Sequence, residues 1–227
     1  VLGDLMLDHY MWGTVTRISP EAPVPVVEID SESEQFGGAA NVTNNILGLG
    51  ATALPIGVIG DDNSGQRLLE LMRKAGCATE GLFVDPERPT TIKTRVIAHT
   101  QHVVRADRES KKNLSPEMQE RIFGFLADII ETVDALLIED YNKGVVTKDV
   151  IQELIAVARK YHKTITVDPK LNNFLEYKNV TVFKPNRREV EEAMGGRLKT
   201  AADVERAGKQ LLELLDAENV LITRSED

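Results

Sequence analysis

The second half of the chain alternates between short apolar runs and longer amphipathic segments. Four of the apolar runs have the length of β-strands, and they are Asp134–Glu139, Thr164–Val167, Val180–Phe183 and Asn219–Thr223. Their hydrophobicity is nearly continuous along each run. Such runs are typical of strands that are covered on both faces in a parallel sheet.

Helical patterns separate these runs, and each begins with a capping signal. Ser115 stands before a proline at the first helical position, Thr147 can cap the next segment, and Thr200 with Asp203 resembles a capping box. Apolar residues then recur on one face of each segment. Because strand and helix alternate, the sequence predicts an α/β fold with a doubly wound, mostly parallel sheet between helices.

The first half contains helical patterns over 38–50 and 64–75, with strands near 53–58 and 81–84. Three further β-prone segments have no partner helices, and they are Pro23–Ile29, Thr90–Ile97 and Gln101–Arg105. We expect them to form a small β-sheet that projects from the main sheet as a lid, from insertions at about 11–35 and 88–107. The alternative is that they extend the edge of the main sheet.

Composition narrows the class of protein. The chain has 227 residues, which is enough for one α/β domain, here residues 1–227. A net charge of −9 argues against a general nucleic-acid surface, because no excess of Lys and Arg is present to neutralise phosphates. No run of 18 apolar residues indicates a membrane span. The single cysteine, Cys77, excludes an internal disulfide, favours a packed structural role and indicates a reducing, cytoplasmic setting.

Polar and charged residues follow each of the four apolar runs. Asp140 and Lys143 follow the first run and Asp168 and Lys170 the second, whereas Lys184–Glu189 and Arg224 follow the third and fourth. Ligands of an open parallel sheet bind beyond the carboxyl ends of its strands. Each segment alone could be a solvated loop, but four together favour a polar site on that edge.

A second candidate feature is the segment Gly37–Asn41. Adjacent glycines let the backbone approach a ligand closely, and the helix start behind them offers free N–H groups. Asn41 can donate and accept hydrogen bonds, which suits sugar hydroxyls. Taken alone, the pair of glycines favours a plain tight turn over a ligand site.

These motifs together resemble those of the ribokinase/PfkB carbohydrate kinases. Gly37–Thr43 followed by Gly50 and Gly60 is similar to the first signature of that family, and Gly3–Asp8 resembles its opening strand-end motif. Asn186–Glu189 resembles the Asn-x-x-Glu motif. The resemblance covers the whole chain and implies a ribokinase-like fold with a β-sheet lid and a reaction that uses ATP and Mg²⁺.

A narrower resemblance lies within the first. Arg17–Val26 before Gly37–Asn41 is similar to kinases acting on D-glycero-β-D-manno-heptose 7-phosphate, as are 140–144, 168–170 and 223–226. It implies transfer of phosphate from ATP to the anomeric hydroxyl, giving the 1,7-bisphosphate used for ADP-heptose and the lipopolysaccharide core. It also implies a homodimer formed through the lid and a possible fused adenylyltransferase domain.

The resemblance implies roles for individual residues. The substrate-binding set comprises Asp8, Gly37, Gly38 and Asn41 for sugar hydroxyls, Arg17, Lys93, Arg95 and Lys143 for the sugar phosphate, and Asp140, which binds substrate or shapes its loop. Lys93 and Arg95 are two apart and should share one face of a strand. The ATP and Mg²⁺ set comprises Asp168, Lys170, Asn186, Arg187, Arg188, Glu189, Thr223 and Arg224, with Glu189 acting on the metal through water.

The chain departs from the family pattern in one respect. The Gly-Ala-Gly-Asp motif, whose Asp is the general base in the family, is absent, and we expect it after Asp227 in a protein truncated here at both ends. Two alternatives therefore stay open. One is a related kinase acting on an unphosphorylated sugar, nucleoside or aminosugar, and the other is a catalytically silent sugar-binding or dimerisation module.

Overall fold

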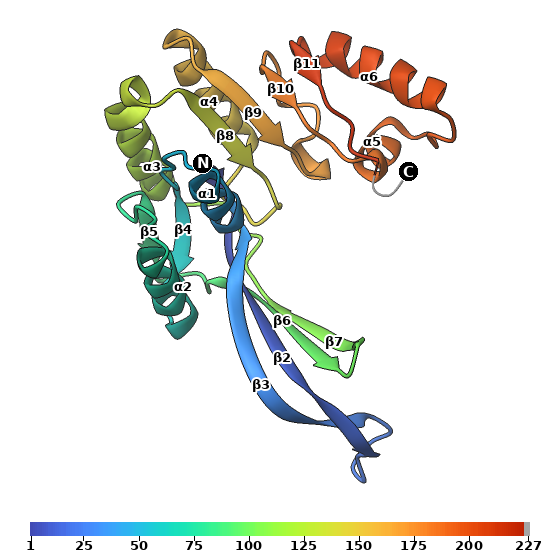
Figure 1. The fold of residues 1–227 in the computed structure, drawn as a ribbon. Helices are drawn as coiled ribbons and strands as arrows, with labels where there is room; N and C mark the ends of the chain where they lie inside the picture. The colour runs from blue at the N-terminus through green and yellow to red at the C-terminus, as the bar shows by residue number, and fades with distance from the viewer. Residues whose placement is uncertain (225–227) are drawn as a thin grey trace. The chain divides into compact units, whose positions relative to one another are not determined.

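The computed structural model describes residues 1–224, which form two compact units (Figure 1). The first unit comprises Val1–Asp4, Pro55–Gly57 and the chain from Lys111 onward. The second comprises Leu5–Leu54 and Val58–Ser110. Each unit therefore collects segments that are distant in the sequence.

A five-stranded parallel sheet forms the centre of the first unit, in the order β1-β8-β9-β10-β11. The strands are β1 (Leu2–Gly3), β8 (Ala135–Glu139), β9 (Thr164–Asp168), β10 (Val182–Phe183) and β11 (Asn219–Val220). The predicted apolar runs in the second half each overlap a strand of this sheet. Ile138 and Val167 are fully buried, as expected for strands covered on both faces.

The helices of the first unit begin where the capping signals predict. They are α3 (Pro116–Ile129), α4 (Lys148–Lys160), α5 (Arg187–Met194) and α6 (Ala201–Leu215). The side chains of Ser115, Thr147 and Thr200 each accept a hydrogen bond from the backbone N–H three residues later. Helix α4 packs on β9 and α6 on β11 (Figure 1).

The second unit contains a four-stranded sheet in the order β3-β2-β6-β7. Its strands are β2 (Leu5–Ile18), β3 (Pro25–Gly38), β6 (Thr91–Ala98) and β7 (Gln101–Arg108), and β2 and β3 form one long antiparallel ribbon (Figure 1). The β-prone segments thus form a sheet of their own, and the alternative of an edge extension is wrong. Strand β3 extends further than predicted, and β2 was not predicted as a strand.

Two helices and a small two-stranded sheet complete the fold. Helix α1 (Ala39–Gly48) lies within the predicted range 38–50, and α2 (Asn63–Lys74) begins one residue before the predicted range 64–75. Strands β4 (Gly57–Gly60) and β5 (Leu82–Asp85) pair with each other. Two short 3-10 helices, η1 (Ile130–Thr132) and η2 (Leu171–Asn173), follow α3 and β9.

We predict that Gly144→Ala destabilises the protein far more than Gly195→Ala. Both glycines have a left-handed backbone, with φ of 84° and 69°, so both substitutions carry the cost of about 1 kcal/mol for that conformation. A Cβ at Gly144 would lie 2.0 Å from the carbonyl oxygen of Lys112, whereas one at Gly195 would meet nothing within 4 Å. Urea denaturation should show at least about 2 kcal/mol of additional loss for Gly144→Ala. Equal losses would contradict this account of the 140–146 loop.

Candidate functional site

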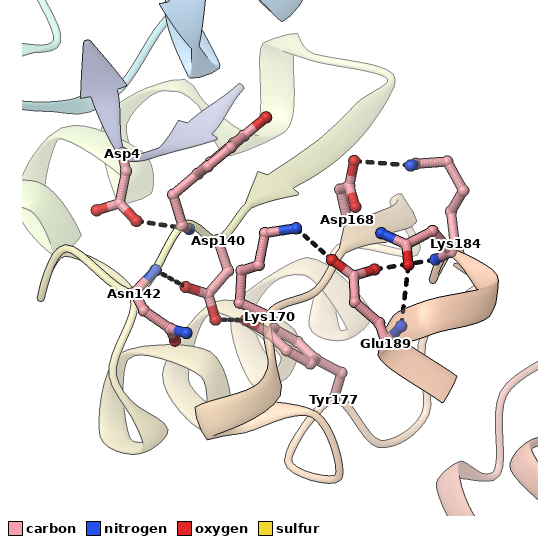
Figure 2. A network of polar contacts seen from close by, with 10 residues as sticks. Asp4, Asp140, Asn142, Asp168, Lys170, Tyr177, Lys184 and Glu189 are labelled. Atoms are coloured by element: carbon pink, nitrogen blue, oxygen red, sulfur yellow. Dashed lines mark hydrogen bonds and ion pairs between the residues drawn. The ribbon is translucent and has the colours of Figure 1, made fainter. Parts of the chain in front are cut away.

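The carboxyl ends of three parallel strands place charged side chains beside one another in one row. Figure 2 shows two of them, Asp168 and Lys184. Glu139 ends β8, and its register partner in β9 is Asp168. Lys184 follows β10 and forms an ion pair with Asp168, with 2.7 Å between Nζ and Oδ2. Parallel register therefore produces the polar edge that the strand ends predict.

Glu139 is the most perturbed carboxyl group of this row. The side chain is buried, and this burial, with the negative charge of Asp168, raises its pKa from 4.5 to about 7. Lys184 and Lys170 act in the opposite direction. Glu139 therefore binds a proton close to neutral pH, which limits the negative charge of the row.

Lys170 and Glu189 form a second charged pair beside this row (Figure 2). The ammonium group of Lys170 contacts Glu189 Oε1 and lies 5.3 Å from the ring centroid of Tyr141. Of the two side chains, Lys170 is 31% exposed and Glu189 10%. The arrangement leaves a partly exposed cation at the carboxyl edge.

The Asn-x-x-Glu motif forms the start of helix α5. Asn186 Oδ1 accepts the backbone N–H of Glu189 at 2.9 Å, and Glu189 Oε2 accepts the backbone N–H of Asn186 at 2.9 Å. Thr223 lies beside this turn, because its carbonyl oxygen accepts the N–H of Arg187. The motif thus has a structural role in the helix cap, and it also aims the second Glu189 oxygen at Lys170.

The loop that follows β8 is held by Asp4, a residue that the sequence analysis did not single out. Asp4 is 1% exposed, and its Oδ2 accepts the backbone N–H groups of Tyr141 at 2.7 Å and Lys143 at 3.2 Å (Figure 2). Burial raises the pKa of Asp4 to about 6, although the Tyr141 amide opposes this. The sequence could have indicated Asp4 as a candidate, because it directly follows the first strand, as the other candidate polar residues follow theirs.

Asp140 is engaged within the protein. Its Oδ1 accepts the backbone N–H of Asn142, and its Oδ2 accepts the Asn173 side chain at 3.1 Å and the Tyr177 hydroxyl at 2.7 Å. Burial and the Asp140 charge raise the pKa of Tyr177 well above its usual value. Of the two roles expected for Asp140, this geometry favours shaping of the loop.

A second group of predicted residues comes together in the other unit, around Asp8. Asp8 Oδ1 lies 2.8 Å from Arg95 Nη1, and their side chains are 17% and 19% exposed. Gly37 of β3 is adjacent, since a Cβ there would lie 3.1 Å from Asp8 Cγ. Gly38, with φ of 55° and ψ of −136°, turns the chain into α1, where Asn41 is an exposed residue of the first turn.

Cations line the same sheet beside Asp8. Lys93 is the register partner of Asp8 and lies two residues before Arg95 in β6, as predicted. Its Nζ is 3.5 Å from Asp107 Oδ2. Burial lowers the pKa of Arg95, but the hydrogen bond and charge of Asp8 outweigh this and raise it. Arg95 is therefore a permanent cation at this position.

The remaining predicted residues lie elsewhere. Arg17 is exposed near the end of β2, nine residues and therefore roughly 30 Å of strand beyond Asp8. Arg187 pairs with Glu191, and Arg188 and Arg224 are exposed. The last two residues of the 223–226 motif lie outside the described residues.

Two properties limit what the described residues can hold. Across 1–224, no group of three or more His, Cys, Asp or Glu side chains is arranged to bind a metal ion. Mg²⁺ suits such a site only if water and substrate phosphates supply most of its ligands. None of the described helices is long and apolar enough to span a membrane.

A polar pocket at the amino ends of β9 and β10 does not belong to this site. Arg159, His162 and Lys163 line it together with Thr164 and Thr181. Because these residues precede or begin the strands, the pocket lies at the opposite edge of the sheet from Asp168 and Lys184.

Comparison with solved structures shows a shared fold. The chain aligns with phosphofructokinase-2 from Escherichia coli in complex with substrates and products at a TM-score of 0.75, with 18% identity, covering 99% of this chain and 72% of that one. Arabidopsis thaliana ribokinase complexed with ribose and ATP aligns at 0.72, with 14% identity over 98% and 70% of the two chains. The predicted ribokinase-like α/β fold is confirmed.

Sequence comparison shows the family. The chain is 44% identical over 227 residues to the bifunctional protein HldE of Pelobacter propionicus, covering 100% of this chain and 46% of that protein. It is 40% identical over 226 residues to HldE of Helicobacter pylori strain J99, covering 100% and 49%. The chain thus spans about half the length of these curated relatives. Residues 1–227 match the pfkB family carbohydrate kinases, and the chain belongs to that family.

Proposed function

We propose that this chain is the kinase part of an enzyme that phosphorylates D-glycero-D-manno-heptose 7-phosphate. ATP donates its γ-phosphoryl group to the anomeric hydroxyl, and the product is the 1,7-bisphosphate. The observation that carries the proposal is the match along the whole chain to HldE proteins at 40–44% identity. The Arg17–Val26 motif adds the heptose class of substrate.

The sugar half of the site lies around Asp8 and α1. The Asp8 carboxylate and the Asn41 amide bind sugar hydroxyls. Gly37 leaves room for the Asp8 side chain, because a Cβ there would lie 2.6 Å from Met6 Cγ and 3.1 Å from Asp8 Cγ. Lys93 and Arg95 attract the phosphate group of the substrate, because both cations lie beside Asp8. Arg17 is left out of this pocket, because it lies far along β2.

The four-stranded sheet that carries these residues is the lid of one kinase domain. Closure over the sugar would exclude water from the transferred phosphoryl group, as phosphoryl transfer requires. The insertions predicted from the sequence, at about 11–35 and 88–107, make up most of this sheet.

The nucleotide half lies on the carboxyl edge of the parallel sheet. Lys170, Lys184 and Arg187 supply positive charge for phosphates beside Asn186 and Thr223. Glu189 would hold Mg²⁺ through water, and the metal, when bound, would supply positive charge to the transferring phosphates. Lys143 projects from the loop that Asp4 holds. The proposal assigns no general base among residues 1–224.

Two partners follow from the proposal. The enzyme is a homodimer through the lid, supported by an apolar row of register partners (Met11, Val96 and Val104) on the face opposite Asp8, where Val104 is 52% exposed. A second, adenylyltransferase part completes the protein, since the bifunctional relatives are about twice as long as this chain.

Asn41→Ala tests the sugar half. We expect the KM for heptose 7-phosphate to rise about 10- to 100-fold, because a hydrogen-bonding partner is lost, while the KM for ATP stays nearly constant. Steady-state kinetics with heptose 7-phosphate, free heptose and a nucleoside measure both constants and the substrate class. Asn45→Ala, an exposed change one turn later in α1, is the control. A preference for an unphosphorylated substrate would favour a related kinase, and binding without turnover would favour a silent module.

Glu189→Gln tests the nucleotide half. A glutamine at this position keeps the capping box with Asn186 but removes the charge facing Lys170 and Mg²⁺. We expect kcat to fall roughly 10- to 100-fold with little loss of helix stability. Glu192→Gln removes the same charge from an exposed position of α5 and should leave kcat unchanged. A normal kcat for Glu189→Gln would contradict the metal-organising role.

Glu139→Gln tests the charge of the row. Because the folded pKa of Glu139, about 7, exceeds the ordinary 4.5, its contribution to stability is present below pH 4.5 and is lost as pH rises to about 7. Between pH 5 and pH 8, the wild type should therefore lose about 2–4 kcal/mol of unfolding free energy that the Glu139→Gln variant does not lose. Denaturation at both pH values, with the exposed Glu153→Gln as control, measures this. An unchanged pH dependence would mean that Glu139 is ionised in the folded protein.

A further inference from the structure

An aromatic pair continues the Asp8 face of the four-stranded sheet. Side chains alternate along a strand, so Asp8, Tyr10 and Trp12 point to one face of β2. The β-bulge in this strand comes only after Trp12, so the alternation is intact over these residues. The Tyr10 and Trp12 rings are stacked, with centroids 6.1 Å apart and planes 15° from parallel.

Arg95 joins the aromatic pair to Asp8. Its guanidinium carbon lies 5.1 Å from the centroid of the Tyr10 ring, and its Nη1 lies 2.8 Å from Asp8 Oδ1. A continuous surface is therefore formed by Asp8, Arg95, Tyr10 and Trp12. We call the two aromatic side chains the Tyr10–Trp12 strip, and Asp8 and Arg95 form the charged end beside it.

The neighbouring strands add charge to the same face. Lys93 and Asp107 are register partners, as are Arg95 and Arg105. Asp107 accepts from both Lys93 and Arg105. With Asp8 and Arg95, this face carries three cations and two carboxylates, so it favours a ligand with negative charge.

Packing within its own unit does not explain why a tryptophan occupies position 12. It is 41% exposed, and its indole N–H lies 3.5 Å from Ser33 Oγ, which is a long hydrogen bond. An exposed flat ring next to an ion pair combines an apolar surface for C–H groups with partners for hydroxyl and phosphate groups. A sugar phosphate presents all three kinds of group.

We propose that the Tyr10–Trp12 strip binds the carbon chain of the sugar phosphate and selects substrates by the length of that chain. The inference rests on the proposed function, because it takes Asp8 as the anchor of the sugar. Tyr10 and Trp12 lie about 7 Å and 13 Å along the strand from Asp8, so a longer sugar contacts more of the strip. A second copy of the chain suits the opposite face, whose row of Met11, Val96 and Val104 is apolar.

The experiment compares Trp12→Ala and Trp12→Phe in the full-length enzyme that carries this chain. Trp12→Ala should raise the KM for heptose 7-phosphate about tenfold with little change in kcat, and Trp12→Phe should stay within about threefold. The preference for heptose 7-phosphate over mannose 6-phosphate should fall roughly fivefold in Trp12→Ala. Val84→Ala, a change at an equally exposed residue of β5 outside this sheet, should leave the KM unchanged.

Fluorescence gives a readout that does not depend on turnover. The emission of Trp12, taken as the difference between wild type and Trp12→Phe, should change on titration with heptose 7-phosphate and saturate near the KM. Because Trp12→Phe conserves a ring, this measurement stands even if Trp12→Ala fails to fold.

The outcomes separate this inference from the proposed function. Phosphoryl transfer with an unchanged KM and a silent Trp12 overturns the strip and leaves the kinase in place. A Trp12 response to sugar phosphate without turnover supports the strip and contradicts the kinase. Dissociation of a dimer by Trp12→Ala, with KM unaffected, would assign the strip to a second copy and overturn the inference. If no sugar phosphate binds, both proposals fail.

Discussion

Parallel register is the constraint on which the candidate nucleotide site depends. It brings the carboxyl ends of β8, β9 and β10 to one edge, so Glu139, Asp168 and Lys184 are neighbours although they are distant in sequence. Two carboxylates on adjacent strands repel each other, and burial adds to the cost of ionising Glu139. The lysines and a proton on Glu139 offset that cost, which explains how a buried acidic row can stand beside a site for phosphates.

Rigidity at this edge comes from side chains that have no direct part in the proposed chemistry. Asp4 holds two amides of the 140–146 loop, and Asp140 is fixed by Asn173 and Tyr177. A buried carboxylate with several amide or hydroxyl donors has few alternative positions, because each lost bond would leave a buried polar group unsatisfied. Lys143 is therefore presented from a loop whose backbone is set in advance, as preorganised binding of a charged group requires.

Local signals predicted much of the fold. Continuous apolar runs and the caps at Ser115, Thr147 and Thr200 placed the strands and helices of the second half, because these patterns depend on residues close in sequence. The 14-residue β2 was missed, since it mixes apolar, charged and glycine residues and depends on pairing with β3 and β6. Pairing with β3 and β6 stabilises β2, and no local pattern in the sequence reveals these partner strands.

The sequence likewise predicted some parts of the candidate site and not others. A motif identified Asp8, the need for cations beside a sugar phosphate indicated Lys93 and Arg95, and the structure brings these residues together. The two readings of Asp140 could not be separated by sequence, because the deciding contacts come from residues 33 and 37 positions later. Arg17 shows a different limit of sequence analysis. The motif match indicated that Arg17 belongs to the family pattern, but it could not indicate how far Arg17 lies from Asp8.

The two faces of the four-stranded sheet illustrate why alternation matters for function as well as for folding. A period of two puts Asp8, Tyr10 and Trp12 on one face and Met11 on the other, so neighbouring residues of one strand are available for different partners. A one-residue slip would exchange the faces and place carboxylates and cations where Val96 and Val104 now lie. The register of β2 against β6, which runs from Met6 and Thr91 to Gly13 and Ala98, therefore keeps the charged and aromatic face separate from the apolar face. In the proposed enzyme, that separation allows one small sheet to bind sugar phosphate on one face and a second copy of the chain on the other.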